Sequence, residues 1–323
     1  MESGEFVCGR VASGVREQYV IWTERGEVTA TLSGRFRAGT SIRPCVGDWV
    51  RLHREKIIVE ILPRRTRLSR KEPGSAAREQ VLAANVDVLF IVSGLDHDYN
   101  PRRLERYLVV AAESGARAVV VLNKADLRAD FEECARAARE QLGTRVLAVS
   151  ARTGLGLGKI AAEVKPGETA ALIGSSGAGK STIVNTLLGE DRQATSEVRP
   201  GDARGRHTTT ERQLFLLPGN WFLIDMPGLR EVGPWAEAEQ ADDVFREIAV
   251  LARQCRFRDC RHEMEPGCAV RAAGLDAGRL AGYRKLKREL AFLERERGRR
   301  LAQAEKRRWK AAERASRRNP KAR

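Results

Sequence analysis

The order of three short nucleotide-site motifs constrains this chain more than any other feature. Residues 123–126 read Asn-Lys-Ala-Asp, residues 174–181 read Gly-Ser-Ser-Gly-Ala-Gly-Lys-Ser, and residues 225–228 read Asp-Met-Pro-Gly. They match the N-K-x-D, phosphate-loop and D-x-P-G elements of one class of nucleotide-binding domain. In that class N-K-x-D ordinarily follows the phosphate loop, whereas here it precedes it. The chain is therefore expected to hold a complete nucleotide-binding domain whose elements come in a permuted order.

The phosphate loop lies in the context that its pattern requires. An apolar run at 169–173 is typical of a strand, and 181–188 is typical of a helix. In such a unit, backbone N–H groups surround the phosphates and the helix N-terminus adds partial positive charge. A glycine-rich turn with a chance lysine would lack both flanking elements. We expect this segment to bind phosphate through Gly174, Ser175, Ser176, Gly177, Ala178, Gly179, Lys180, Ser181 and Thr182.

The Asn-Lys-Ala-Asp segment follows an apolar run at 118–122, and strand ends are where α/β sheets bind ligands. The Asp126 carboxylate can accept two N–H groups from the edge of guanine, and adenine offers no such pair. Asn123 and Lys124 are expected to brace the loop and cover the base. The pattern is short, and it is a weak indication when it stands alone.

A second strand end supports the same interpretation. The apolar run at 146–149 leads into Ser150 and Ala151, which begin 27 residues beyond Asn123. A Ser-Ala element in this place normally adds a backbone contact to the base. Two such elements beside a phosphate loop make coincidence a poor explanation. The sequence therefore predicts a P-loop GTPase core with GTP and GDP as its ligands.

The D-x-P-G element and the loop before it are expected to sense the γ-phosphate. A third apolar run delivers Asp225 to the Mg²⁺ shell, in which the Ser181 hydroxyl is a further ligand. The Gly228 amide would contact the γ-phosphate. A polar loop before the strand would supply one more Mg²⁺ ligand, from either Thr208 or Thr209.

The sequence lacks the usual group for positioning the attacking water. Many GTPases carry glutamine directly after D-x-P-G, but this chain has Leu229, which cannot orient water. His207 in the polar loop is a candidate for that role, and a surface histidine in a basic loop is the alternative. With Lys180, Asp225 and Gly228 it completes the predicted catalytic set. We expect slow intrinsic hydrolysis that accelerates with the right partner.

Three of the six cysteines cluster around one histidine. The string is Cys255-x4-Cys260-x-His262-x5-Cys268, and three thiolates with one imidazole are typical of a structural Zn²⁺ site. No ligand position would remain open, which argues against a catalytic zinc. A disulfide or reactive thiols are the alternatives, and a cytosolic compartment disfavours the disulfide.

The positive charge is concentrated near the C-terminus. The net charge is +15, and residues 284–323 hold 17 of the 58 Lys and Arg residues but only 5 of the 43 Asp and Glu residues. Such asymmetry is typical of a contact with nucleic acid, and a solvated basic helix is the alternative. Without a long apolar run or a signal-peptide pattern, we expect a cytoplasmic protein with no membrane contact. Because nothing indicates a coiled coil or a repeat, a monomer is the default expectation.

Three regions of the chain differ in their patterns. Residues 1–75 hold short strand-like runs with glycine turns, which predicts a small β-barrel, either an OB-fold or an SH3-like barrel. Strand-like and helix-like segments alternate through 78–232, with helices near 102–114 and 131–142, which predicts a three-layer α/β domain. The remainder, 233–323, is expected to be a mainly helical zinc-binding domain with a basic tail, and with one or two helices over 282–318.

Together these motifs closely resemble the circularly permuted GTPases of the RsgA (YjeQ) family, which mature the small ribosomal subunit. The resemblance rests on the three nucleotide-site motifs, the Ser-Ala element, the loop at 205–210 and the Cys/His cluster, and it spans all three regions. It implies an N-terminal OB-fold, a permuted GTPase core and a C-terminal zinc domain. It also implies GTP hydrolysis stimulated by the small subunit, binding to that subunit and its rRNA, and release once maturation is checked.

Two other functions stay open at this point, besides an ATPase, which is the weakest rival because Asp126 favours guanine. A signalling GTPase would bind a protein partner in a salt-insensitive way, because phosphate contacts are the ones that weaken steeply with salt. An RNA-binding module with a non-essential GTPase core would tolerate the loss of Lys180. The permuted order itself favours a clamp, since Asp225 lies only 30 residues before Cys255 and movement of the switch would pull on the zinc domain.

Overall fold

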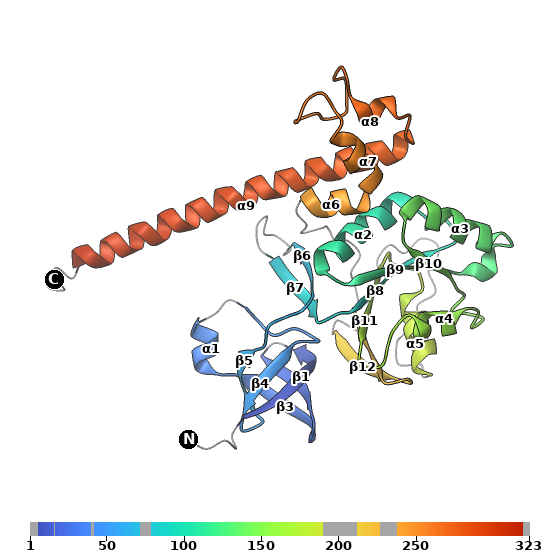
Figure 1. Ribbon diagram of the computed structural model, residues 1–323. Coiled ribbons are helices and arrows are strands. Elements are labelled where there is room, and N and C mark those ends of the chain that lie inside the picture. The colour runs from blue at the N-terminus through green and yellow to red at the C-terminus, as the bar shows by residue number, and fades with distance from the viewer. Residues whose placement is uncertain are drawn as a thin grey trace, which may run out of the picture. The chain divides into compact units, whose positions relative to one another are not determined.

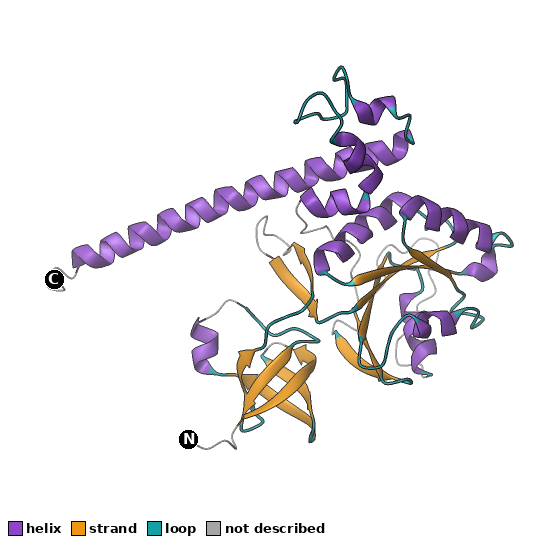
Figure 2. Ribbon diagram, viewed as in Figure 1, coloured by secondary structure: helices purple, strands orange, loops and turns teal. Residues whose placement is uncertain are grey.

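The computed structural model describes residues 6–15, 17–39, 42–71, 79–189, 212–226 and 238–318. The chain divides into two compact units, Met1–Ser69 with Val81–Pro234 and Arg70–Gln80 with Trp235–Arg323. The first unit contains a small barrel and an α/β sheet, and the second is mainly helical (Figure 1, Figure 2).

Five strands near the N-terminus close into a barrel. They are β1 (Phe6–Val15), β2 (Gln18–Thr23), β3 (Gly26–Leu32), β4 (Trp49–His53) and β5 (Ile57–Ile61), with the short helix α1 (Gly34–Gly39) after β3. The order β1-β2-β3-β5-β4 closes because β4 also pairs with β1. Side chains such as Ile21, Val50 and Ile58 fill the interior. This OB-like arrangement confirms the predicted barrel, although the strand-like runs of the sequence, which lie at 18–22, 28–32, 49–53 and 56–62, do not include β1.

The α/β part of the first unit is built on a mostly parallel sheet. Its strands lie in the order β10-β9-β8-β11-β13-β12, and only β12 runs antiparallel to its neighbour β13. The bounds are β8 (Val88–Gly94), β9 (Arg117–Asn123), β10 (Arg145–Ala148), β11 (Thr169–Gly174), β12 (Gln213–Leu217) and β13 (Trp221–Asp225). Every residue of β8 and β11 is buried, which explains their largely apolar sequences.

Helices cover both faces of this sheet. The helices α2 (Pro101–Ser114) and α3 (Phe131–Leu142) lie on one face, and α4 (Leu157–Ala162) and α5 (Lys180–Leu188) lie on the other (Figure 1). The local sequence defines the ends of α2, because the Asn100 side chain caps two N–H groups of the first turn and Gly115 ends the helix in a left-handed conformation. The two helices predicted here and the three-layer α/β architecture are confirmed.

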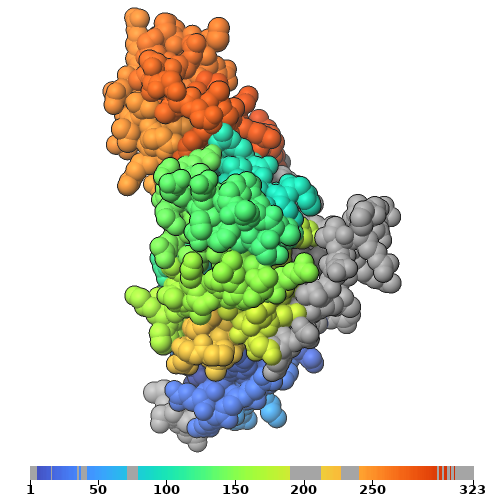
Figure 3. All heavy atoms as spheres, turned by 90° about the vertical axis from the view of Figure 1, so that its right-hand side faces the viewer, coloured from blue at the N-terminus to red at the C-terminus, as the bar shows by residue number. Residues whose placement is uncertain are grey.

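The barrel joins the α/β sheet directly. The strand β1 pairs with β12 through Ser13 and Gln213, so the barrel and the α/β strands form one continuous sheet. In the space-filling view the blue barrel lies against the golden β12 and β13 (Figure 3). The buried guanidinium of Arg10 donates to Thr169 Oγ1 at 2.6 Å and lies over the Phe222 ring at 4.9 Å. One barrel side chain therefore contacts both β11 and β13.

The second unit is mainly helical. Its helices are α6 (Ala238–Val244), α7 (Arg246–Ala252), α8 (Ala269–Ala272) and α9 (Ala277–Arg318), and the hairpin of β6 (Arg67–Lys71) with β7 (Glu79–Ala84) contributes to both units. The buried rings of Phe245 and Tyr283 are in contact, which packs the start of α7 against α9. α9 is a single helix of 42 residues, where the sequence predicted one or two. Among the described helices, none has the length and apolar character needed to cross a membrane.

Candidate nucleotide site and candidate metal site

The carboxyl ends of four parallel strands meet at one edge of the α/β sheet. The strand β8 ends at Gly94, β9 at Asn123, β11 at Gly174 and β13 at Asp225. The three predicted motifs therefore start on strands of one sheet, although they lie far apart along the chain. In α/β proteins, ligands bind at this edge. The order of strands in the sheet, and not their order along the chain, determines which loops are adjacent. The three motifs therefore meet at one edge although their chain order is permuted.

Asn123 connects three of the predicted elements. Its Nδ2 donates to the carbonyl oxygen of Ala178 in the phosphate loop at 2.9 Å. Its Oδ1 accepts the backbone N–H of Ala151 at 2.9 Å. Asn123 is only 2% exposed, so its amide serves neighbouring loops rather than solvent. This one side chain therefore links the phosphate loop to the loop after β10, which is predicted to contact the base.

Asp126 and Ser150 join the two loops that are predicted to contact the base, which follow β9 and β10. The Ser150 hydroxyl donates to Asp126 Oδ1 at 2.5 Å and accepts the N–H of Thr153 at 3.2 Å. Ser150 is buried, whereas Asp126 is exposed within the short 3-10 helix Ala125–Leu127. The hydroxyl orients the carboxylate while the group stays accessible, as a carboxylate must to accept N–H groups from a base.

The phosphate loop packs against β8 at its first position. Gly174 has a φ of 147°, and a Cβ atom there would lie 2.1 Å from the carbonyl oxygen of Val92. No larger residue fits between the two strands without displacing backbone. The helix α5 begins at Lys180, directly after the loop, so the N–H groups of its first turn add partial positive charge to the site.

Lys180 reaches back across the phosphate loop. Its Nζ donates to the carbonyl oxygens of Gly174 at 2.9 Å and Ser175 at 2.6 Å. Burial lowers the pKa of Lys180 to about 8, and the nearby carboxylates of Asp225 and Asp98 oppose that shift. Asp225 is 9% exposed at the end of β13. An ammonium group and a carboxylate thus lie near each other where the sequence predicts the terminal phosphates and Mg²⁺.

Two carboxylates that sequence reasoning missed belong to the same edge. Asp96 and Asp98 follow β8 directly. Asp96 Oδ2 accepts a hydrogen bond from Lys124 Nζ at 2.6 Å, and Asp98 Oδ2 accepts one from the Ser175 hydroxyl. Their position in the sequence could have indicated them. They follow the carboxyl end of β8, and β8 lies between β9 and β11 in the sheet.

Four of the predicted site residues lie outside the described residues. They are His207, Thr208, Thr209 and Gly228. The other residues that the sequence predicts to bind phosphate lie within the described residues. Ser176, Gly177 and Gly179 are in the loop, and Ser181 and Thr182 are in the first turn of α5.

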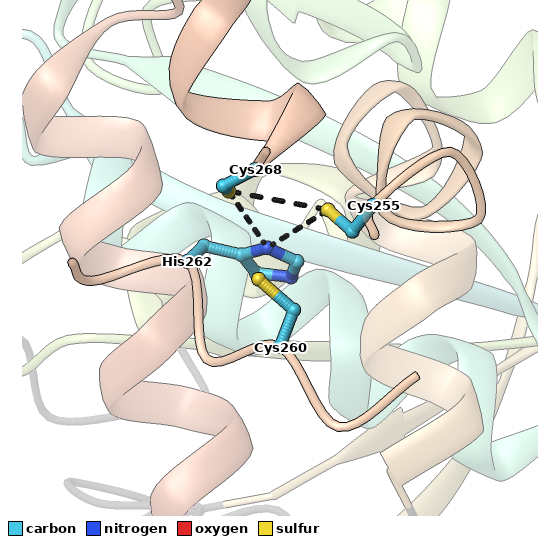
Figure 4. A group of neighbouring side chains, drawn as sticks. All are labelled: Cys255, Cys260, His262 and Cys268. Atoms are coloured by element: carbon cyan, nitrogen blue, oxygen red, sulfur yellow. Dashed lines mark hydrogen bonds between the residues drawn. The ribbon is translucent and has the colours of Figure 1, made fainter. Parts of the chain in front are cut away.

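The four predicted metal ligands converge in the second unit (Figure 4). The ligand atoms of Cys255, Cys260, His262 and Cys268 all lie within 4.8 Å of one another. His262 Nδ1 is 3.6 Å from Cys255 Sγ and 3.5 Å from Cys268 Sγ, and the two sulfurs are 3.9 Å apart. Sulfur ligands lie about 2.3 Å from a tetrahedral Zn²⁺, and so about 3.8 Å from each other. The spacing therefore fits four ligands that share one ion.

The backbone between the ligands forms a tight loop. His262 has a left-handed φ of 60°, and Cys268 directly precedes α8. The Glu265 carboxylate accepts the backbone N–H groups of residues 261, 263 and 264, which closes the loop between the last two ligands. Burial lowers the pKa of His262, which favours the neutral imidazole that binds a metal.

Known proteins are similar in sequence to this chain over most of its length. The model of the RsgA GTPase family matches residues 61–235. The chain is 47% identical to the small ribosomal subunit biogenesis GTPase RsgA of Opitutus terrae, over 95% of this chain and 90% of that protein. The chain belongs to the RsgA GTPase family. As a member of this family it is a GTP hydrolase that uses GTP, GDP and Mg²⁺, and its Cys/His cluster is compatible with one structural Zn²⁺.

Solved structures show the same fold in other proteins. The crystal structure of YjeQ from Thermotoga maritima is 26% identical, with a TM-score of 0.66 over 88% of this chain and 99% of that one. The structure of YloQ, a circularly permuted GTPase, is 22% identical, with a TM-score of 0.64 over 90% of this chain and 98% of that one. The RsgA-family chain thus has the barrel, the permuted core and the C-terminal Cys/His cluster that its sequence predicted.

Proposed function

We propose that this chain is a GTPase of small-ribosomal-subunit maturation. It binds the subunit and its rRNA, hydrolyses GTP to GDP and phosphate at a rate that the subunit stimulates, and uses its nucleotide state to control release. The observation that carries the proposal is 47% identity, across 95% of the chain, to a relative named for the biogenesis of that subunit. The convergence of base-side and phosphate-side loops on Asn123 independently supports guanine-nucleotide chemistry.

The proposed roles in nucleotide binding follow from the chemistry at the sheet edge. Asp126, oriented by Ser150, accepts the N–H groups of guanine, and Lys124 covers the base. Ala151 lies beside the base, where Asn123 holds its loop. The N–H groups of residues 174–182 surround the phosphates, and the Lys180 ammonium binds the terminal ones.

The proposed hydrolytic groups come from both sides of the γ-phosphate. Mg²⁺ would be held by Ser181, Asp225 and either Thr208 or Thr209, and when bound it neutralises charge on the phosphate oxygens. The Gly228 amide senses the γ-phosphate. His207 is proposed to position the attacking water, because Leu229 has no group that can do so.

The proposed organisation has three domains, which are 1–75, 78–232 and 233–323, in a cytoplasmic monomer. The barrel and the basic α9 are assigned to rRNA. On the barrel, the Phe6 ring is 54% exposed and lies against His53 and below the Arg51 guanidinium. An exposed ring beside cationic and aromatic groups suits stacking on unpaired bases.

The test is GTP hydrolysis by the purified protein with and without small ribosomal subunits. Small subunits are expected to raise kcat by about tenfold or more, since a site without the usual glutamine should turn over slowly until the right partner binds. Large subunits and bulk RNA serve as controls and should have little effect. A rate that small subunits leave unchanged would overturn the proposal and favour a signalling GTPase.

A further inference from the structure

One contact at the nucleotide site joins two segments that no sequence motif links. Residues 95–100 connect β8 to α2, and within them Asp98 accepts a hydrogen bond from the Ser175 hydroxyl. Ser175 is the first position after Gly174 in the phosphate loop and is only 7% exposed. The two residues are 77 positions apart along the chain. A buried hydroxyl at the start of the phosphate loop is thus fixed by a carboxylate from a different loop.

Asp98 is itself held from the opposite side. Arg103 of α2 donates to Asp98 Oδ1 at 2.8 Å and to the carbonyl oxygen of the same residue at 2.5 Å. The other carboxylate oxygen, which receives Ser175, also lies 3.5 Å from the backbone nitrogen of Gly94. The Asp98 side chain is 13% exposed. A carboxylate with donors on both of its oxygens is a firm anchor, because it cannot rotate without losing a charge-assisted hydrogen bond.

The phosphate loop has a second anchor near its other end. Asn123 donates to the carbonyl oxygen of Ala178 at 2.9 Å. Between the two anchors, Ser176 and Gly177 are exposed. The loop is therefore held on both sides and open in the middle, where its N–H groups are accessible to a phosphate.

We propose that Asp98 is a positioning residue of the nucleotide site, which holds the phosphate loop through Ser175 in its binding conformation before nucleotide arrives. The inference rests on the proposed nucleotide-binding role of this loop. Because a carboxylate repels phosphate, Asp98 does not itself attract the nucleotide. It instead raises the fraction of molecules in which the phosphate loop already has its binding conformation. Apparent affinity falls in proportion to that fraction. Once nucleotide is bound, its phosphates order the loop, so loss of Asp98 should raise Kd and leave kcat unchanged.

The experiment compares the variants Asp98→Ala, Ser175→Ala, Asp98→Asn and the double alanine variant. Each single alanine variant removes the same hydrogen bond and is expected to weaken the binding of GDP and GTP about tenfold. The double variant should be no worse than either single variant, because the lost contact is shared. Asparagine can accept from Arg103 and donate to Ser175, so Asp98→Asn should bind nearly as well as the unaltered protein.

Kd is measured with a fluorescent GDP analogue, and kcat at saturating GTP. Asp130→Ala is the matched control, since Asp130 is an exposed carboxylate of the same sheet domain that pairs with Arg128 at 2.6 Å. This control should change neither quantity. A fall in kcat with Kd unchanged in Asp98→Ala, additive losses in the double variant, or failure of Asp98→Asn to restore binding would each overturn the inference.

Two further outcomes separate this inference from the proposed function. Normal nucleotide binding by the unaltered protein, with the same Kd in all variants, would overturn the inference alone. No nucleotide binding by the unaltered protein would overturn both. If Asp98→Ala does not fold, the other variants still test the inference. The expected pattern is about a tenfold loss of nucleotide affinity in Ser175→Ala and no loss in Asp98→Asn.

Discussion

At the scale of single residues, the surroundings of a charged group alter its chemistry, and Lys180 is the clearest case. Its ammonium group is half-buried against the carbonyl oxygens of the phosphate loop. Burial lowers its pKa to about 8, against the opposing effect of Asp225 and Asp98. In the nucleotide-free protein the positive charge is therefore expected at neutral pH and is lost in mildly alkaline solution.

The affinity for GDP is expected to fall as the pH rises through about 8. Bound phosphate stabilises the charged form of Lys180, so binding above that pH must take up a proton. Kd should be nearly constant around pH 7 and should rise by up to about tenfold per pH unit above the pKa. Calorimetric titration in two buffers of different ionisation enthalpy measures the proton uptake. A Kd that stays flat to about pH 9, without proton uptake, would show that the lysine remains charged in the empty site.

At the scale of elements, backbone segments in close contact join the barrel to the α/β sheet. Gly47 lies in the turn before β4, and a Cβ atom there would be 2.1 Å from the carbonyl oxygen of Ala84. The Asn85 side chain donates to the Gly47 carbonyl oxygen at 3.0 Å, and Val46 forms a backbone bridge with Ala83. This junction leaves no space for a side chain at position 47.

The substitution Gly47→Ala is expected to destabilise the first unit far more than Gly26→Ala. Both glycines have positive φ, 89° and 115°, so both variants carry backbone strain. A Cβ atom at Gly26 would meet nothing within 4 Å, whereas one at Gly47 meets backbone. We expect the free energy of unfolding to fall by about 2 kcal/mol more in Gly47→Ala, measured by urea denaturation. Equal losses in the two variants would mean that the junction can relax.

The Cys/His cluster is the second element-scale feature, because its ligands come from loops that the metal would hold together. Cys260→Ser removes one thiolate and is expected to abolish stoichiometric zinc and lower the unfolding temperature of the second unit. Zinc content by atomic spectroscopy and a thermal melt measure the two effects. Cys8→Ser, at an exposed cysteine of the barrel, is the control. Full zinc content in Cys260→Ser would remove Cys260 from the ligand set.

At the scale of the whole molecule, the positive charge is concentrated near the C-terminus. Residues 284–323 hold 17 Lys and Arg residues against 5 Asp and Glu residues, and nearly all of them are in α9. Exposed aromatic side chains, Phe292 and Trp309, lie on the same helix. A helix with this composition suits a contact with RNA phosphates and bases.

Binding to the small subunit is expected to depend on salt and on the nucleotide. Between about 50 mM and about 200 mM salt, the affinity should fall at least about tenfold, which corresponds to release of counterions from two or more phosphate contacts. A non-hydrolysable GTP analogue should support binding about tenfold tighter than GDP does, if nucleotide controls release. Co-sedimentation with purified subunits measures both. Equal affinity in the two nucleotide states would exclude nucleotide-controlled release.

Much of the site was predictable because its chemistry is local. The glycines of 174–179, the lysine that follows and the flanking apolar runs specify a strand, loop and helix within a few residues. The four metal ligands fall within 14 residues, and the structure brings their ligand atoms together. The sequence also predicted a helix near 102–114, and the residues that end α2, Asn100 and Gly115, act only on the backbone next to them. By contrast, β1 was missed because its sequence, with two glycines and mixed polarity, lacks a clear alternation.

The sequence by itself determined which chemical groups this chain carries: a glycine-rich loop that ends in a lysine, a segment proposed to bind guanine, a carboxylate proposed to hold Mg²⁺, and a Cys/His cluster compatible with zinc. The tertiary structure decided which of these groups touch. Asn123 reaches Ala178, Asp98 reaches Ser175 and Arg10 reaches Thr169 across 55, 77 and 159 positions of the chain. Such contacts follow from strand order within the sheet and from the docking of the barrel, and no local pattern encodes either of them.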